Sequence, residues 1–408
     1  MACSDSSSIA SFPSRSGGCC AGSRATQAEF LAHERWNHSH IHHSHIWRSL
    51  NMGNFAKSKA LQNISSRVTQ AHYTICPVFV ASNVAAELGW LDEEFKLAGA
   101  HLGYLRSLPD NIGWLPHFSH KLDNLFRDGG NIPSIWAHAD VTRTKLIGLT
   151  AAHAGGQILV RTDSGINKVA DLKGRKIGLA KSRNAAKVDW WRGTAERGIE
   201  LALDLASLKR SDVEIVNVEH DDSFTLEPAS KPSEIWAIRR LKEDLSLNPE
   251  ILALEERKVD AIYSNAGRAQ HLERTGKFKV IEDLARHPDW TLQVANSPYA
   301  ITVNAELAET RPEVVVAFLR ATVRAGRWIN ANRAAAAEIL HRVTFHPTLE
   351  DTVRAIADTD FIPNLSPKNL AGIEIEKAFL LSHGYIKKDF EVSKWADARY
   401  LEDALGSL

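Results

Sequence analysis

The sequence of 408 residues contains few methionines and few cysteines for its length. Its two methionines are Met1 and Met52, and three of its four cysteines precede residue 21. The fourth, Cys76, has no second cysteine after Met52 with which it could form a disulfide. A disulfide framework is therefore excluded for this part of the chain, and we expect a reducing, cytoplasmic location. A lone cysteine of this kind is either a candidate nucleophile or a small buried hydrophobe.

An excess of charge of one sign and long apolar runs are also missing. The 49 basic and 49 acidic residues give a formal net charge of +0. This balance excludes the strongly basic surface typical of proteins that bind nucleic acid or anionic membranes. No apolar run approaches the roughly twenty residues of a transmembrane helix. We therefore expect a globular monomer with a small-molecule partner, long enough for two domains.

Residues 1–51 differ in composition from the rest of the chain. Ser, Gly and Cys dominate up to Ser23, and a histidine cluster follows, made up of His38, His40, His42, His43 and His45. The segment lacks the hydrophobic stretch of a secretory signal. We expect a disordered tail, or a stretch upstream of a true start at Met52, with metal binding by the histidines as the alternative.

After residue 70, β-branched and aromatic runs alternate with helical segments, which is typical of a parallel α/β architecture. One predicted strand ends at Cys76. Because the segment 159–302 carries its own βαβ pattern, we expect a two-lobed fold with one lobe inserted into the other. Residues 71–158 together with 303–408 would form the first lobe, and 159–302 the second. The ligand cleft would lie between the lobes, at the C-terminal ends of strands.

The stretch 117–133 concentrates groups that bind anions. Its apolar spacing predicts a short helix that Gly129 and Gly130 end, followed by the start of a second helix. Backbone N–H groups at a helix start preceded by two glycines can bind an oxyanion. Arg127 can add a planar bidentate donor to these N–H groups, and together they would form an oxyanion cradle made of Arg127, Gly129 and Gly130. His117 would lie near the opening of this cradle. The alternative is an ordinary surface turn with an exposed arginine.

A second set of candidate ligand contacts lies in the two expected lobes. Ser182 and Arg183 are predicted to open a long helix, from which they could contact a ligand across the cleft. Phe118 is the corresponding pocket candidate in the first lobe. We expect the neighbouring Trp190 and Trp191 to serve packing rather than stacking on an aryl ligand.

These motifs resemble those of a known family. Ile75-Cys76-Pro77 corresponds to the family's Asn-Cys-Pro, and the later motif keeps the family's order and spacing at His117-Phe118, Arg127, Gly129-Gly130 and Ile132-Pro133. From about Tyr73 onward the chain therefore resembles the 2'-hydroxybiphenyl-2-sulfinate desulfinase family of dibenzothiophene desulfurisation. That family lies within the periplasmic-binding-protein-like superfamily, which also holds sulfonate and taurine receptors.

The resemblance implies an enzyme that cleaves the carbon–sulfur bond of an aryl sulfinate and releases sulfite, with no metal or organic cofactor. It implies Cys76, His117 and Arg127 as catalytic residues. It also implies that Arg127, Gly129 and Gly130 bind the sulfinate oxygens. Whether Cys76 acts as nucleophile or as proton donor stays open.

Departures from the family pattern leave the substrate's ring system open. Asn131 replaces an acidic residue, and His120 stands where the family has an aromatic side chain. One alternative function is a non-catalytic sulfonate-binding protein of an uptake system, which would use the same fold and cleft. Another is a pyrimidine-precursor synthase of the same fold, whose cysteine-rich iron motif is missing from this sequence.

Overall fold

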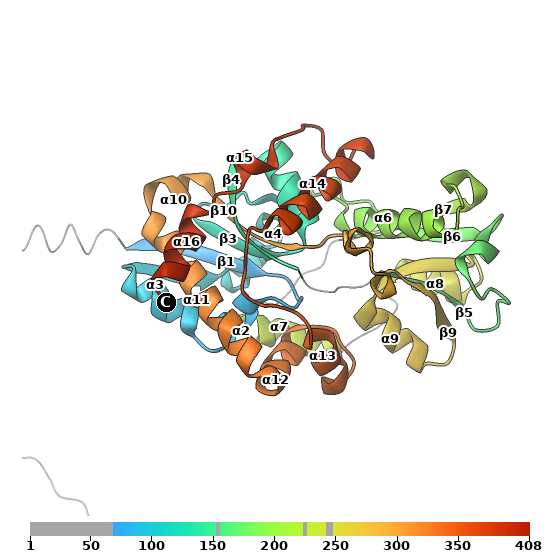
Figure 1. The fold of residues 1–408 in the computed structure, drawn as a ribbon, viewed down its shortest axis with the longest axis horizontal. Coiled ribbons are helices and arrows are strands. Elements are labelled where there is room, and N and C mark those ends of the chain that lie inside the picture. Colours follow the sequence, from blue (N-terminus) through green and yellow to red (C-terminus); the bar gives the residue numbers. More distant parts are fainter. Residues whose placement is uncertain (1–67, 152–155, 223–226, 242–247) are drawn as a thin grey trace, which may run out of the picture. The chain divides into compact units, whose positions relative to one another are not determined.

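The computed structural model describes residues 68–151, 156–222, 227–241 and 248–408. The expectations for residues 1–51 and for Met52 lie outside the described residues. Ile64–Leu408 forms one compact unit, which contains two five-stranded sheets (Figure 1). Among the described helices, none combines the length and the apolar character that crossing a membrane requires.

The first sheet has the strand order β2-β1-β3-β10-β4. β1 runs parallel to β2 and β3, whereas β10 runs antiparallel to β3 and β4. The C-terminal ends of β1, β2 and β3 therefore lie along the same edge of the sheet. The bounds of its strands are β1 (Thr69–Ile75), β2 (Ala100–Tyr104), β3 (Leu125–Gly129), β4 (Thr144–Thr150) and β10 (Tyr299–Asn304).

The second sheet has the strand order β7-β6-β8-β5-β9. β6 runs parallel to β7 and β8, and β5 runs antiparallel to β8 and β9. Both sheets are mixed, so the prediction of a parallel architecture is wrong for β10 and β5. Its strands are β5 (Gly156–Arg161), β6 (Lys176–Ser182), β7 (Glu214–His220), β8 (Ala261–Asn265) and β9 (Phe278–Asp283).

The chain passes from the first sheet to the second before β5 and returns before β10. The boundaries expected from the sequence, after residues 158 and 302, fall inside these two strands, because hydrophobicity does not show which sheet a strand joins. Residues of the inserted segment also enter the first core, since Ile235 and Trp236 of α7 (Pro232–Leu241) belong to its buried cluster. The two-sheet α/β class itself is confirmed.

Helices cover both faces of the first sheet. On one face, Phe126 of β3 stacks against Phe318 of α11 with ring centroids 4.6 Å apart, and α2 and α3 complete this layer (Figure 1). On the other face, Ile132 and Leu380 belong to a second buried cluster. The helices of these layers are α2 (Ala81–Glu87), α3 (Trp90–Leu97), α5 (Asn131–Trp136), α11 (Pro312–Ala331), α14 (Pro367–Ser382) and α15 (Val392–Trp395).

The second sheet is covered in the same way. Leu179 and Ile199 pack in one cluster on the side of α6, which runs beside β6 and β7 in Figure 1. Ile262 and Leu272 pack in another cluster with α8 and α9. The bounds are α6 (Trp190–Leu205), α8 (Pro249–Glu255) and α9 (Ala266–Arg274). Further helices are α4 (Pro116–Ser119), α10 (Ala305–Thr310), α12 (Arg333–Val343), α13 (Leu349–Ile356) and α16 (Arg399–Gly406).

The stretch 117–133 is only partly helical. α4 ends after Ser119, where His120 adopts a left-handed conformation with φ of 57°, and Leu125 opens β3. The predicted helix is therefore wrong beyond Ser119. β3 lies between β1 and β10, and the hydrogen bonds of this central position override the helical spacing of the apolar residues. The second predicted helix is confirmed as α5.

Candidate active site

A cavity of about 380 Å³ is lined by residues from both parts of the folded unit. Cys76, His117, Arg127 and Gly130 all lie in its wall. Although these residues are far apart in sequence, β1, β3 and α4 bring them to the same place. The structure thus brings these candidate residues together at one cavity.

Backbone contacts hold Cys76 at the end of β1. Its N–H donates to the Asp128 carbonyl at 2.9 Å, which extends the pairing of β1 with β3 by one residue. The Asn83 amide of α2 donates to the carbonyls of Cys76 (3.1 Å) and Val78 (2.9 Å). Because the turn through Pro77 is fixed on both sides, the thiol has a defined position in the cavity wall.

The Cys76 sulfur contacts two nitrogen groups. His117 Nε2 lies 3.6 Å from Sγ, and Arg127 Nη2 donates to Sγ at 3.5 Å. On the other side of the imidazole, His117 Nδ1 lies 2.7 Å from Thr74 Oγ1. If the Thr74 hydroxyl donates to Nδ1, the Nε2–H can donate to the sulfur; in the other tautomer Nε2 can accept the thiol proton. The same geometry can therefore stabilise a Cys76 thiolate in one tautomer of His117 and accept a hydrogen bond from a Cys76 thiol in the other.

His117 is held neutral. Its pKa lies well below the ordinary value of 6.5, first because the ring is buried and then because the Arg127 and Arg106 guanidiniums are close. A charged imidazolium is disfavoured beside two other cations. The positive charge in contact with Cys76 is therefore the guanidinium of Arg127.

Arg127 differs in part from the predicted bidentate clamp. Its side chain is only 1% exposed. Nε donates to the His117 carbonyl at 2.9 Å, and Nη1 donates to the Gly130 carbonyl at 2.8 Å and to Ser134 Oγ at 2.9 Å. These bonds tie α4, β3 and α5 together. Nη2 is the nitrogen that remains for the Cys76 sulfur and for a ligand. Arg127 can therefore donate to a ligand from one nitrogen, and not from two nitrogens as the predicted bidentate clamp requires.

The two glycines are required for close packing. A Cβ at Gly129 would lie 2.3 Å from Cys76 Sγ, and a Cβ at Gly130 would lie 2.4 Å from the Asn296 side-chain amide. Asn296 Oδ1 also accepts the Ile132 N–H at 2.9 Å, at the start of α5. A protein side chain thus occupies part of the predicted oxyanion cradle. Sequence spacing could not reveal this, because Asn296 lies in the segment that leads into β10.

Asp128, next to Gly129, is a second buried ionisable group behind Cys76. Its Oδ2 accepts a 2.6 Å hydrogen bond from Ser82 Oγ, and its side chain is 0% exposed. Burial raises the pKa of Asp128 to about 7, although the hydrogen bond from Ser82 and the charge of Arg127 act in the opposite direction. This carboxyl therefore changes charge near neutral pH.

The remaining predicted pocket residues are divided. Phe118 lines the cavity, whereas Ser182 and Arg183 are not among its lining residues. Ser182 ends β6, and its N–H donates to Asp189 Oδ2 at 2.7 Å. Arg183 pairs with Glu219 of β7 and with Asp221, just after that strand. The helix predicted from Ser182 begins only at Trp190, because the Asp189 side chain caps it there.

Aromatic side chains form much of the cavity wall, among them Trp190 and Trp191, which the sequence suggested for packing. They come from α6, α7, β8, β10 and the segment after α12, and are Trp190, Trp191, Trp236, Tyr263, Tyr299 and Phe345. The adjacent tryptophans at the start of a helix were the available signal in the sequence. Their contribution to a pocket depends on where α6 lies, which sequence spacing does not show.

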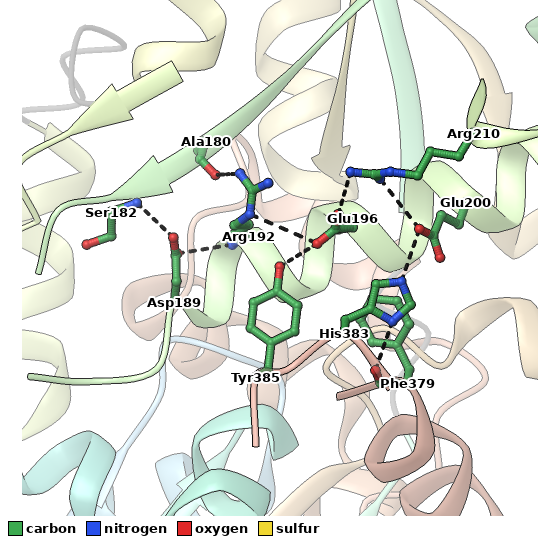
Figure 2. A network of polar contacts seen from close by, with 10 residues as sticks. All are labelled: Ala180, Ser182, Asp189, Arg192, Glu196, Glu200, Arg210, Phe379, His383 and Tyr385. Carbon is green, nitrogen blue, oxygen red and sulfur yellow. Dashed lines mark hydrogen bonds and ion pairs between the residues drawn. The ribbon is translucent and has the colours of Figure 1, made fainter. Parts of the chain in front are cut away.

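A polar network holds α6 in place (Figure 2). Glu196 accepts hydrogen bonds from the Tyr385 hydroxyl at 2.6 Å and from Arg210 Nη2 at 2.8 Å. One turn further along α6, Glu200 contacts His383 Nε2 at 3.2 Å. Because Tyr385 and His383 follow α14, the network links α6 to the helical layer of the first sheet. The Trp190 end of α6 is thereby fixed over the cavity.

No group of three or more His, Cys, Asp and Glu side chains in the described part of the chain is arranged to hold a metal ion. The ionisable groups in contact with Cys76 are a neutral imidazole and a guanidinium. The chemistry available from these residues is therefore thiol chemistry, proton transfer and anion binding.

The fold is that of the two-lobed periplasmic-binding-protein-like class. The sulfonate-binding protein SsuA from Methylobacillus flagellatus KT superposes with a TM-score of 0.58 at 17% identity, covering 84% of this chain and 94% of that one. The desulfurization enzyme DSZB superposes with a TM-score of 0.59 at 24% identity, covering 83% and 99%. A cysteine-to-serine variant of that enzyme, in complex with biphenyl-2-sulfinic acid, gives a TM-score of 0.58 at 23% identity, with the same two coverages.

Sequence comparison identifies a particular relative. Over 361 residues the chain is 27% identical to the 2'-hydroxybiphenyl-2-sulfinate desulfinases of Rhodococcus erythropolis and Rhodococcus qingshengii, which covers 82% of this chain and 93% of each relative. No family model matches the chain. The resemblance inferred from the Cys76, His117 and Arg127 motifs is confirmed by these relatives.

Proposed function

We propose that the protein is a desulfinase that cleaves the carbon–sulfur bond of an aryl sulfinate. The observation that carries the proposal is the placement of the Cys76 sulfur between His117 Nε2 and Arg127 Nη2 in the wall of a cavity. A protein that only binds a sulfonate needs a cationic group but no thiol held in this way. The similarity to curated desulfinases supports the same function.

The proposed reaction is a hydrolysis. The aryl sulfinate and one water give the arene and hydrogen sulfite: the carbon–sulfur bond breaks, one water proton goes to the ring carbon, and the remaining hydroxide goes to sulfur. No electron donor is needed, because the electron pair of the broken bond forms the new carbon–hydrogen bond.

Cys76 has two roles open to it in this scheme. As a thiolate it attacks the sulfinate sulfur, the carbon–sulfur bond breaks, and the ring carbon takes up the proton that the thiol released; water then hydrolyses the sulfur–sulfur bond of the Cys–S–SO2⁻ intermediate, which gives hydrogen sulfite and returns a proton to Cys76. As a thiol it protonates the ring carbon directly, and water supplies hydroxide to the sulfur and a proton to Cys76. His117 Nε2 is within reach to exchange a proton with Sγ in either case, and its lowered pKa returns the ring to the neutral form afterwards. Arg127 Nη2 stabilises negative charge at the sulfinate or at the thiolate.

The aromatic wall supports an aryl group as the bulk of the substrate. Trp190, Trp191 and Phe118 belong to the lining, and aromatic rings contribute both contact area and favourable stacking or edge-on geometry. His120 is fully buried and its Nε2 contacts Thr302 Oγ1 at 3.0 Å. His120 stands where the family has an aromatic side chain, so the packing behind the site differs from the family pattern. Comparison of aryl sulfinates with different ring systems would identify the preferred substrate.

A second candidate function is the binding of a sulfonate or similar anion without turnover. The fold is compatible with it, because the sulfonate-binding protein SsuA and the desulfurization enzyme superpose on this chain almost equally well. The deciding experiment incubates the purified protein with a panel of aryl sulfinates and aryl sulfonates. Sulfite and arene formed in equal amounts support the desulfinase; saturable binding with no sulfite from any sulfinate supports the binding protein.

We also propose that the enzyme works in the cytoplasm as a monomer. Cys76 is a free cysteine in the structure, and its proposed chemistry requires a reduced sulfur. Cys76, His117 and Arg127 all come from one chain, and the proposed reaction is written with these three residues alone.

A further inference from the structure

Arg106 lies at the same sheet edge as Cys76 and Gly130. β2 ends at Tyr104, two residues before Arg106, while β1 and β3 end one residue before Cys76 and Gly130. Because the three strands are neighbours and parallel, their ends meet along one edge. In open α/β sheets this edge is where ligands bind.

Arg106 borders the cavity that holds the site. It lines the cavity together with Cys76 and His117, and the residue is only 7% exposed. Its charge acts on the site residues, since Arg106 is the next cationic contribution after Arg127 to the lowered pKa of His117. A guanidinium remains charged at any pH at which the protein is folded.

Arg127 leaves an incomplete site for an anion. Three of its hydrogen bonds go to the carbonyls of His117 and Gly130 and to Ser134, and Asn296 occupies the start of α5 through the Ile132 N–H. A sulfinate presents two oxygens, each of which accepts hydrogen bonds. One nitrogen of Arg127, shared with Cys76, cannot satisfy both oxygens.

We propose that Arg106 is the second sulfinate-binding residue, which holds the anion together with Nη2 of Arg127 beside the Cys76 sulfur. This inference rests on the proposed desulfinase function. It assigns the anion subsite to two arginines, one in β3 and one in the turn that follows β2. It also makes the cavity selective for a negatively charged group at its Cys76 end, with the aryl group toward the tryptophans.

The test measures binding in a Cys76→Ser background, in which turnover does not interfere. The probes are biphenyl-2-sulfinate and methyl biphenyl-2-yl sulfone, a neutral analogue that keeps the rings and both sulfur oxygens. Arg106→Gln should raise the Kd of the sulfinate roughly 10- to 100-fold, the range expected for lost hydrogen bonds to a charged group. Binding of the sulfone should change much less, so the preference for the anion should fall.

Arg106→Lys and Arg143→Gln complete the experiment. The lysine variant keeps the charge but loses the planar donor group, so its Kd for the sulfinate should lie between those of the other two proteins. Arg143 is a matched control, because its side chain is 78% exposed and pairs with Glu309 away from the cavity. Arg143→Gln should bind both probes like the parent protein.

The outcomes separate this inference from the proposed function. If the parent protein binds no aryl sulfinate, the desulfinase proposal itself fails. If the parent binds the sulfinate, and Arg106→Gln or Arg106→Lys binds it equally well with an unchanged melting temperature, the role of Arg106 is overturned. Should the glutamine variant not fold, the lysine variant decides alone: unchanged affinity overturns the inference, and a severalfold loss confined to the sulfinate supports it.

Discussion

Gly129 lies so close beneath Cys76 that a Cβ at this position would come within 2.3 Å of the sulfur and 2.5 Å of the Cys76 Cβ. Gly129→Ala must therefore displace the cysteine from His117. We expect sulfite release to fall at least tenfold, together with the roughly 1–3 kcal/mol loss of stability typical of overpacking. Steady-state kinetics and urea denaturation measure the two effects.

The control for this change is Gly406→Ala in α16, where a Cβ meets nothing within 4 Å. This variant should keep full activity, because Gly406 lies near the C-terminus of the chain and is not among the cavity-lining residues. Equal activity of Gly129→Ala and wild type would show that the position of the Cys76 sulfur is not important.

Cys76→Ser tests the reaction itself. Serine keeps nearly the same size but is a far weaker nucleophile near neutral pH than a thiolate. We expect sulfite release from aryl sulfinates to fall by orders of magnitude while binding, measured by calorimetry, survives. Turnover that is unaffected in Cys76→Ser would rule out both roles proposed for the thiol.

Arg127→Lys should affect stability as well as turnover. A lysine keeps one charge but cannot bond the His117 carbonyl, the Gly130 carbonyl and Ser134 at the same time, as Arg127 does. We expect a loss of at least about 2 kcal/mol in the free energy of unfolding, since hydrogen bonds from charged groups contribute about 1.5–3 kcal/mol. Turnover should fall because α4 and His117 lose their support.

The comparison for Arg127→Lys is Arg143→Lys, at the exposed pair with Glu309. Exposed ion pairs contribute about 0–1 kcal/mol, so this variant should unfold nearly like wild type in urea. Similar stabilities for the two variants would contradict a buried structural role of Arg127.

Asp128 should make stability depend on pH in a defined direction. Burial raises its pKa to about 7 in the folded protein, whereas an unfolded aspartate titrates near about 3.9. The folded state therefore retains a proton that the unfolded chain releases. The resulting stabilisation is fully present below about pH 4 and is lost as the pH rises through about 7.

Asp128→Asn removes this dependence, because the amide stays neutral at every pH. Relative to wild type, the variant should gain free energy of unfolding as the pH is raised from about 5 to about 8. Urea denaturation at several pH values measures the difference in free energy of unfolding between the variant and wild type. His117 and His120 have pKa values lowered mainly by burial, so their titration changes stability with pH in the opposite direction. Because both proteins contain these histidines, their contributions cancel in the difference. A difference that is flat or falls with pH would contradict the raised pKa.

Ser82→Ala provides a second check on Asp128. Its hydroxyl donates to Asp128 Oδ2, and this bond holds the pKa of Asp128 below the value that burial alone would give. Removing the hydroxyl should therefore move the pH-dependent loss of stability to higher pH. A move to lower pH would show that the Ser82 bond favours the protonated carboxyl.

The sequence by itself determined the α/β class, and its resemblance to the desulfinase family brought Cys76, His117 and Arg127 together as one group. The alternation of strands and helices depends on local patterns of residues, and so does the end of β1 just before Cys76 and Pro77. The start of α5 was likewise predictable from the glycines before it. Local signals of this kind depend on residues close in sequence, so they can be recognised without the fold.

Tertiary structure decided how these residues can act. The carbonyls and the hydroxyl that bind Arg127, and the amide of Asn296 over Gly130, belong to segments whose positions depend on sheet pairing. Ile132 and Asn296, for example, are 164 positions apart in the chain. The same applies to Trp190 and Arg106, which line the cavity because α6 and β2 lie where long-range packing holds them. Long-range packing decides which N–H groups of Arg127 are left for a ligand and which side chains line the cavity. No local pattern of the sequence encodes this packing.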